Sequence, residues 1–374
     1  MKRSGNLWPE LVSWANLLAA AQTAARGKRK RPDVARFLLN LEPEVSALQR
    51  ELALQEYRPG PYRTFWIRDP KPRMISAAPF RDRVVHHAVT TVLEPVFEPR
   101  FTPFSFASRK GFGQHKALCL AREACGRYPY VLKCDIRKYF PSTDHQILKE
   151  LLARAIKCRP TLDLAGRIID GSNPQEDAAG YFRGDDLFTP FERRRGLPIG
   201  NQTSQFFANV YLNPLDHFIL RKLRPALYLR FVDDFVLFGD KRQLAGMLPA
   251  IAEFLEGLRL SLHPGKSRVY RCADGLTFLG WRLFPERARL SRRNVIRMRG
   301  KLRTLSAQYH RGTIEFDDIR RRVHAWLGHA GFGDTWRLRE SLFDSFTLIA
   351  AERGRNSARG FLEQQFKECP RLEP

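Results

Sequence analysis

At Phe231-Val232-Asp233-Asp234-Phe235-Val236-Leu237-Phe238, two adjacent aspartates interrupt an otherwise apolar run. Burying such carboxylates costs several kcal/mol unless a cation compensates for their charge. The flanking aromatic and β-branched residues predict a β-hairpin, with strands at Leu227 to Val232 and Phe235 to Phe238 and the aspartates at or beside its turn. A divalent metal ion is the compensating charge that we expect, and a solvated hairpin tip is the alternative.

A second strand pattern lies about a hundred residues upstream. It reads Tyr130-Val131-Leu132-Lys133-Cys134-Asp135 and ends in a single aspartate. Three carboxylates on two strands could therefore converge. Mg²⁺ prefers oxygen ligands and is usually held by one or two carboxylates together with substrate phosphates. Such a trio can support two-metal phosphoryl transfer, in which one ion lowers the pKa of a primer 3′-hydroxyl and the other neutralises the triphosphate.

In these two motifs the chain resembles the reverse transcriptases, whose palm carries an Asp135-type motif and a Phe-Val-Asp-Asp-type motif in this order. Further segments match other motifs of that family, from the fingers to the primer grip. These segments are Lys71-Pro72-Arg73, 79–88, 105–111, Gly196 to Gln205 and Phe278-Leu279-Gly280-Trp281. The resemblance implies an α+β, right-hand polymerase fold with fingers, an antiparallel-sheet palm and a helical thumb.

Within the family, the Gly200-x-x-x-Ser204-Gln205 pattern is informative. Most bacterial relatives, including the group II intron enzymes, carry Gln and Pro where this chain has Ile199 and Gln205. The chain is in this respect similar to the reverse transcriptases of diversity-generating retroelements, as is its segment 323–339. Those enzymes copy a template-repeat RNA with frequent errors opposite adenine, for mutagenic retrohoming of the cDNA into a variable protein gene.

The resemblance implies a role for each residue of the predicted site. Asp135, Ile136, Asp233 and Asp234 are predicted to hold two Mg²⁺ ions, for which Mn²⁺ could substitute. Lys266 matches a lysine proposed to protonate pyrophosphate, and an exposed lysine after a Pro-Gly turn is the alternative.

The predicted nucleotide and nucleic-acid contacts also have structural alternatives. Lys71 and Arg73 match the triphosphate-binding pair, or form an exposed basic turn. Phe140 matches the aromatic that excludes a ribose 2′-hydroxyl, or is a core aromatic. Ile199 and Gln205 are expected beside the nascent base pair, where loss of one positioning contact would lower selectivity by about 1–3 kcal/mol. Arg109 pairs either with template phosphate or with a neighbouring acid, and Trp281 is expected to be a packed aromatic near the primer.

Composition agrees with a nucleic-acid enzyme. The 374 residues carry a formal net charge of +25, which predicts a strong, salt-dependent attraction for polyanions. Six cysteines without Cys-x-x-Cys spacing argue against a zinc site and a disulfide framework. No stretch approaches the ~20 apolar residues of a spanning helix, so we expect a cytoplasmic protein without a membrane partner.

We predict four regions along the chain. They are an N-terminal helical extension at 1–61, fingers at 62–130, a palm at 131–284 with a loop-rich insertion at about 157–195, and a basic helical thumb with a tail at 285–374.

The leading functional hypothesis is an error-prone RNA-directed DNA polymerase that takes template RNA, a DNA or RNA primer and dNTPs. Its resemblance implies a small helical accessory variability protein as a further partner. The alternatives are another bacterial reverse transcriptase, of the group II intron or abortive-infection type, and a non-catalytic RNA-binding scaffold.

Overall fold

The structure, a computed structural model, describes residues 2–68, 72–172, 180–344 and 346. The chain divides into two compact units, each assembled from several stretches. Unit 1 comprises residues 1–113, 133–237 and 245–268, and unit 2 comprises 114–132, 238–244 and 269–374. Strands β3 (Tyr130–Asp135), β5 (Asp234–Gly239) and β6 (Arg268–Arg271) and helix α12 (Lys241–Gly257) have residues in both units.

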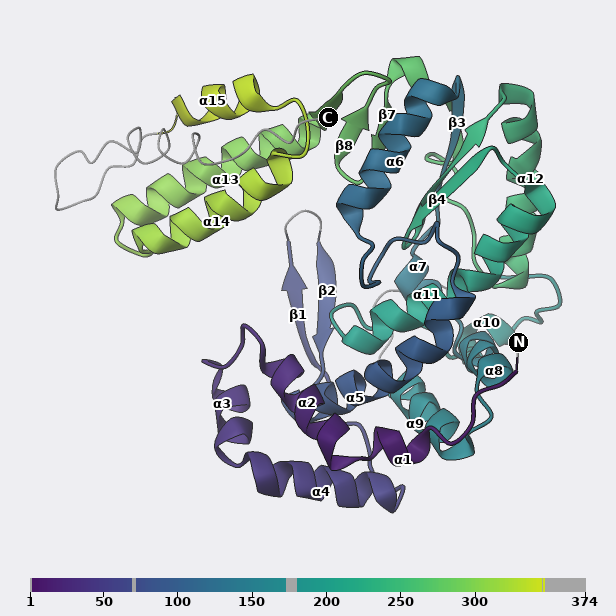
Figure 1. The fold of residues 1–374 in the computed structure, drawn as a ribbon, viewed down its shortest axis with the longest axis vertical. Coiled ribbons are helices and arrows are strands. Elements are labelled where there is room, and N and C mark those ends of the chain that lie inside the picture. The colour runs from purple at the N-terminus through teal and green to yellow at the C-terminus, as the bar shows by residue number, and fades with distance from the viewer. Residues whose placement is uncertain (1, 69–71, 173–179, 345, 347–374) are drawn as a thin grey trace. The chain divides into compact units, whose positions relative to one another are not determined.

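Unit 1 begins with four helices, of which the first three pack against the long helix α5 (Phe80–Phe97) and the fourth packs against the second and third (Figure 1). They are α1 (Trp8–Leu11), α2 (Trp14–Ala25), α3 (Pro32–Leu39) and α4 (Leu41–Ala53). Helix α2 buries Leu17 and several alanines along one side. The small alanine side chains allow close approach to α5. The helical pattern predicted at 34–54 is confirmed, with a break at Asn40, where φ is −113° and ψ is 37°.

A two-stranded antiparallel hairpin follows these helices. Strand β1 (Arg63–Ile67) pairs with β2 (Arg73–Ala77), and Phe65 lies opposite Ile75. All five residues of β1 are exposed. The connection between the two strands includes residues 69–71, which lie outside the described residues.

The predicted carboxylates lie on a four-stranded sheet with the order β4-β5-β3-β6. Its outer strands are β4 (Leu227–Phe231) and β6 (Arg268–Arg271). The β4–β5 hairpin confirms the sequence prediction, and its turn consists of Val232 and Asp233. Because β3 is the neighbour of β5, the strands that carry Asp135 and Asp234 lie side by side. Apolar residues of β3, β4 and β5 are buried, which anchors this sheet in the core.

Five further helices of unit 1 lie within the described part of residues 139–223. They are α7 (Tyr139–Ser142), α8 (His145–Ala155), α9 (Arg159–Asp170), α10 (Thr189–Glu192) and α11 (Gln202–Phe218), which continues into a π-helical turn at Ile219–Leu223. A short 3-10 turn at Glu98–Arg100 follows α5. Helix α9 occupies part of the range predicted to be loop-rich, because its buried residues at helical spacing form an apolar face against α8. Residues 173–179 of that range lie outside the described residues.

Unit 2 combines a small sheet with helices. It contains α6 (Gln114–Arg127), a 3-10 turn at Cys272–Asp274, β7 (Leu276–Phe278), β8 (Trp281–Leu283), β9 (Ala288–Leu290), α13 (Arg292–His310), α14 (Phe316–Ala330) and α15 (Trp336–Asp344). The strands pair antiparallel in the order β7-β8-β9. Leu279 and Gly280 form the two-residue β7–β8 turn, both with positive φ, as this hairpin type requires. Helices α13 to α15 share an apolar core that includes Met298, Leu302 and Val323.

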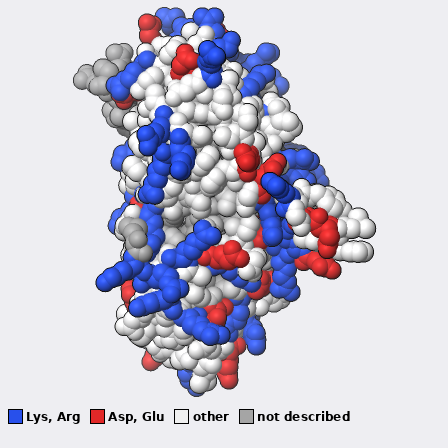
Figure 2. Space-filling model, turned by 90° about the vertical axis from the view of Figure 1, so that its right-hand side faces the viewer, with Lys and Arg blue, Asp and Glu red and all other residues white. Residues whose placement is uncertain are grey.

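Basic side chains are numerous on one face of the molecule. Figure 2 shows one face of the molecule, on which Lys and Arg appear in many places and Asp and Glu in smaller groups. This distribution agrees with the net charge of +25. Among the described helices, none is both long and apolar enough to cross a bilayer.

Candidate active site

The β4–β5 turn places a β-branched residue in a conformation that such residues rarely adopt. Val232 has a φ of +58°, in the left-handed region, which costs about 1–3 kcal/mol for a residue of this type. The Arg230 Nη1 atom donates to the Val232 carbonyl at 3.2 Å. The Ile136 N–H donates to the Asp233 carbonyl, also at 3.2 Å. Hydrogen bonds thus hold both peptide groups that flank the Asp233 Cα.

Asp135 ends strand β3 with its carboxylate partly exposed. Lys266 Nζ lies 3.0 Å from its Oδ1 and 3.2 Å from its Oδ2. The backbone of the same segment is fixed, because the His263 N–H donates to the Asp135 carbonyl at 2.7 Å. The lysine predicted to protonate pyrophosphate therefore forms an ion pair with a predicted metal ligand.

Asp233 and Asp234 are both largely desolvated. Burial raises the pKa of Asp233, the charge of Asp135 raises it further, and Arg73 and Lys266 oppose this rise. Burial also raises the pKa of Asp234 to about 7, with Lys133 opposing the rise and the two other aspartates adding to it. Lys133 Nζ lies 3.4 Å from Asp234 Oδ2, whereas the buried Oδ1 has no hydrogen-bond partner among the described residues. The three carboxylates therefore repel one another, and additional positive charge would stabilise them.

This donor set fits a hard divalent cation. Binding of Mg²⁺ would give the buried Asp234 Oδ1 atom a partner. It would also stabilise the charged forms of Asp233 and Asp234, whose pKa values are raised. Within the described ranges, no group of three or more His, Cys, Asp or Glu is placed so that these side chains alone could hold a metal ion. A Mg²⁺ ion here would therefore need substrate phosphates and water to complete its shell, as is usual for this ion. The Ile136 side chain is buried and aliphatic, so only its backbone carbonyl has ligand chemistry.

The predicted nucleotide-binding residues lie in unit 1. Arg73, at the start of β2, is exposed, and its charge lowers the pKa of Asp233, so the two groups interact. Lys71 lies outside the described residues. The Ile199 carbonyl accepts a hydrogen bond from the Ser76 N–H at 3.3 Å, which joins the loop before α11 to β2. Gly200 in that loop has a φ of +118°, and a Cβ there would lie 3.1 Å from the Ile75 Cγ2 atom.

Phe140 lies in α7, next to the same loop. Its side chain is half-buried, and its carbonyl accepts a hydrogen bond from the Leu197 N–H at 2.8 Å. Gln205 lies in the first turns of α11, and its Oε1 atom accepts a hydrogen bond from Ser108 Oγ at 3.3 Å. Ser108 is another residue with a positive φ, of 52°. The structure thus brings Phe140 close to the loop that carries Ile199, and it pairs Gln205 with the 105–111 motif.

Two predicted nucleic-acid contacts have protein partners. The Arg109 side chain is 5% exposed, donates from Nη2 to Glu98 Oε1 at 2.6 Å and also donates to the carbonyls of Thr102 and Ser105. The acidic partner that the sequence left open is therefore Glu98, and phosphate binding by Arg109 stays a prediction. Trp281, in unit 2, is fully buried and packs against Phe332 with ring centroids 5.2 Å apart. This burial agrees with the expected packing role.

Sequence reasoning missed a buried ionic network beneath the turn. Arg230 on β4 and Asp216 on α11 both have fully buried side chains and form a bidentate pair, with two N–O distances of 2.6 Å. The Tyr228 hydroxyl donates to Asp216 Oδ1 at 2.7 Å. The only sequence signal was an arginine inside the apolar strand 227–231, because a charged residue at such a position requires a partner.

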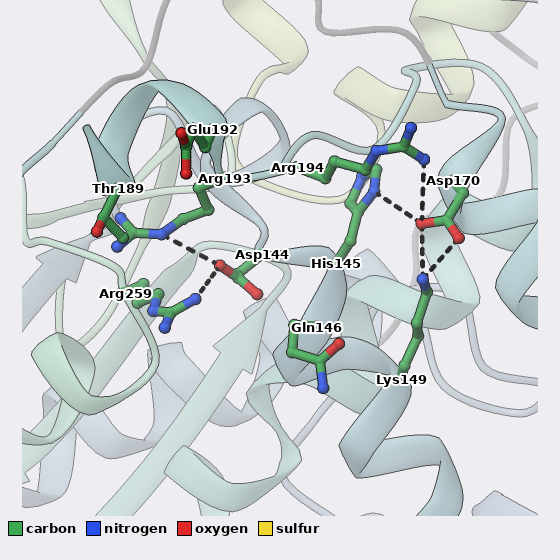
Figure 3. Close-up of a pocket in the computed structure, with 10 residues that line it drawn as sticks. All are labelled: Asp144, His145, Gln146, Lys149, Asp170, Thr189, Glu192, Arg193, Arg194 and Arg259. Carbon is green, nitrogen blue, oxygen red and sulfur yellow. Dashed lines mark hydrogen bonds and ion pairs between the residues drawn. The ribbon is translucent and has the colours of Figure 1, made fainter. Parts of the chain in front are cut away.

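A pocket of about 290 Å³ in unit 1 is lined by other residues than those predicted for the site. Figure 3 shows two ionic groups in it. Asp144 pairs with Arg259 at 2.6 Å and with Arg193 at 3.5 Å, while Asp170 pairs with Lys149 at 2.6 Å. The Asp144 pairs join the start of α8 to Arg193 and Arg259, and the Asp170 pair joins α9 to α8. Charges in the pocket are thus largely compensated within the protein.

Comparison with known proteins identifies a matching family and several similar proteins. Residues 68–283, more than half of the chain, match the family described as reverse transcriptase (RNA-dependent DNA polymerase). Protein YkfC of Escherichia coli (strain K12) is 26% identical over 297 residues, covering 68% of this chain and 75% of YkfC. The group II intron-encoded protein LtrA of Lactococcus lactis subsp. cremoris is 27% identical over 183 residues, covering 48% of this chain but 29% of LtrA.

Among solved structures, an apo telomerase from Candida tropicalis, truncated from the C-terminal domain, has a TM-score of 0.46 and 12% identity, covering 62% of this chain and 56% of that one. The family match and the observed helices with antiparallel sheets confirm the predicted α+β, right-hand polymerase fold. The finer assignment within the family and the region boundaries stay predictions.

Proposed function

Because the chain belongs to the reverse transcriptase (RNA-dependent DNA polymerase) family, we propose that it synthesises DNA on an RNA template with a two-metal site at Asp135, Asp233 and Asp234. The observation that carries this proposal is the placement of Asp135 at the end of β3 and of Asp233 and Asp234 directly before and at the start of the neighbouring strand β5, with both peptides around Asp233 held by hydrogen bonds. Bound Mg²⁺ would lower the pKa of the primer 3′-hydroxyl and neutralise the charge of the leaving pyrophosphate.

The protein's own residues would orient and select the substrates. Arg73, with Lys71, is proposed to bind the triphosphate of the incoming dNTP, because cations near the reacting phosphates stabilise developing charge. Phe140 is proposed to exclude a ribose 2′-hydroxyl. Lys266 is close enough to Asp135 to interact with the same reaction centre, and proton donation to pyrophosphate is its proposed role. Template RNA and a DNA or RNA primer would occupy the basic surface.

The finer proposal is an error-prone polymerase of the diversity-generating retroelement type. An aliphatic Ile199 cannot donate a side-chain hydrogen bond to the nascent base pair, and the Gln205 amide oxygen accepts one from Ser108. Fewer positioning contacts to the nascent pair would lower selectivity. The products would then be mutated cDNA copies of a template-repeat RNA, made together with a small helical accessory protein.

A group II intron-type polymerase is the second candidate. The similarity to LtrA, a group II intron-encoded protein, favours it. The chain spans less than a third of that relative, so LtrA's own activities carry over to this chain only as a proposal.

Primer extension tests both levels of the proposal. The wild-type protein and Asp233→Asn are given a primed, adenine-containing RNA with Mg²⁺ and each dNTP singly, with and without a small helical protein encoded beside this chain's gene. Arg259→Lys is the control, since this residue pairs with Asp144 in the separate pocket of Figure 3.

Extension that is lost in Asp233→Asn and kept in the control would support the polymerase. Frequent incorporation of nucleotides other than T opposite adenine would support the retroelement type, and accurate copying would favour the intron type. A wild-type protein that extends no primer under any of these conditions would refute the proposed activity.

A further inference from the structure

Arg230 makes an unusually complete set of contacts directly before the Asp233 turn. Its side chain is fully buried. A guanidinium has five N–H donors, and hydrogen bonds from Nε, Nη1 and Nη2 reach five acceptor atoms. The acceptors are Asp216 Oδ1, Asp216 Oδ2, Asn209 Oδ1, Ser105 Oγ and the Val232 carbonyl oxygen. Nothing in this set is available to substrate.

Four of these five bonds anchor the guanidinium to the body of unit 1. Asp216 and Asn209 lie on α11, and Ser105 lies in the segment whose backbone also pairs with β4. That segment is fixed further, because Phe106 N–H donates to the Arg230 carbonyl at 2.9 Å and Asn209 Nδ2 donates to the Ala107 carbonyl at 2.8 Å. A group held at four points has a defined position. Through the fifth bond, the guanidinium holds the Val232 carbonyl of the turn in a defined orientation.

The fifth bond acts where the backbone needs support. Val232 is β-branched and has a left-handed φ of +58°, so it would relax to another conformation unless its surroundings hold it. The orientation of the Val232 carbonyl is the orientation of the peptide plane that leads into Asp233. On the other side of Asp233, the Ile136 N–H holds the next carbonyl, and Ile136 directly follows Asp135.

We propose that Arg230 is a positioning residue, which directs the Asp233 carboxylate toward Asp135 by holding the Val232 carbonyl in the strained turn. The inference rests on the proposed function in that it assigns Asp233 to the divalent-metal site. Arg230 touches neither substrate nor metal in this scheme. It acts through the turn and couples it to α11, whose first turns carry Gln205.

The test compares Arg230→Lys with wild type in four measurements. Lysine keeps the charge opposite Asp216, but one ammonium group cannot reproduce the planar set of five donors. The measurements are Mn²⁺ affinity by electron paramagnetic resonance without substrate, kcat and KM for one dNTP, RNA affinity, and Tm. Arg259→Lys makes the same chemical change at an Arg–Asp pair outside this network.

We expect Arg230→Lys to weaken Mn²⁺ binding and lower kcat by about 10- to 100-fold, as is usual when the support of a metal ligand is removed. RNA affinity should stay within about twofold when the measurements are made well below Tm, because the altered turn carries no predicted RNA contact. Arg259→Lys should change none of these values. A residue that only stabilised the fold would lower Tm and leave Mn²⁺ affinity and kcat unaltered.

A second variant keeps the test decisive if Arg230→Lys does not fold. Arg230→Met with Asp216→Leu removes both buried charges at once, a replacement that proteins often tolerate. Wild-type kcat and Mn²⁺ affinity in either folded variant would overturn the inference. If wild-type protein makes no DNA, the proposed polymerase fails, whereas the Mn²⁺ measurement still tests whether Arg230 positions Asp233.

Discussion

Helix α5 contains a histidine whose environment excludes its charged form. His86 is fully buried, and neither ring nitrogen has a hydrogen-bond partner among the described residues. Burial lowers the pKa of His86 from 6.5 to about 3, and the charges of His87 and Arg83 contribute to the decrease. We predict that this one side chain makes the folded protein markedly less stable in mild acid.

The magnitude follows from the difference in proton binding between the folded and unfolded chains. Below its ordinary pKa of 6.5, His86 takes up a proton in the unfolded chain but stays neutral in the folded protein until the pH reaches about 3. The contribution of His86 to stability therefore decreases as the pH falls through this window. At pH 5.0 the difference is 1.5 pH units, or about 2 kcal/mol at 1.36 kcal/mol per unit.

The assay is urea unfolding followed by circular dichroism at pH 7.5 and pH 5.0. Wild type is compared with His86→Leu, which cannot titrate and loses no side-chain hydrogen bond seen in the structure. The loss of unfolding free energy between the two pH values should be smaller by about 2 kcal/mol in His86→Leu. His310→Leu makes the same replacement at an exposed position at the end of α13 and should behave like wild type. Equal pH dependence in wild type and His86→Leu would refute the reasoning.

Three further predictions concern the site. Asp135→Asn should lower kcat in primer extension by about 1000-fold or more while filter binding gives an unchanged RNA affinity, because it removes charge at the reaction centre and no predicted RNA contact; full activity would exclude Asp135 from the site. Phe140→Ala should reduce discrimination between dNTPs and ribonucleotides by about 1–3 kcal/mol in competing single-nucleotide incorporation, and unaltered discrimination would favour the core-aromatic alternative. Asp216→Leu alone should destabilise the protein to urea by about 3–5 kcal/mol because it leaves the Arg230 charge buried and unpaired, and the added change Arg230→Met should recover much of that loss. A single variant as stable as the double one would contradict the buried-pair argument.

Much of the fold followed from local patterns. The hairpin around Asp233 and the strand ending at Asp135 were predicted from runs of aromatic and β-branched residues, because alternation and turn residues are local signals. The prediction of a loop-rich insertion at 157–195 was less accurate. Its glycines and prolines indicated loops, but Leu164, Ala165 and Ile168 give the first part a buried helical face. Apolar spacing over about three turns was the stronger signal there.

The site was harder to predict because its supports come from distant segments. Lys133 stands two residues before Asp135 on the same strand, so its nearness to the carboxylates could have been expected from the strand period. No spacing rule joins Arg230 to Asp216 or to Ser105, which lies 125 residues away. Such pairs depend on how β4, α11 and the 105–111 segment fold together. Sequence patterns predict the acids of a site more readily than the groups that orient them.

The backbone hydrogen bonds around the aspartates explain why an Asp→Asn variant should lose catalysis and keep the fold. The Arg137 N–H donates to the Ser261 carbonyl at 2.8 Å, His263 N–H to Asp135 at 2.7 Å and Ile136 N–H to Asp233 at 3.2 Å. These bonds join the segments that carry Asp135, Asp233 and Lys266 without using any carboxylate. An Asp→Asn change keeps them all, and it also reduces the repulsion that raises the neighbouring pKa values. Asp233→Asn should therefore fold at least as stably as wild type while losing catalysis, which is the combination expected of a functional rather than a structural acid.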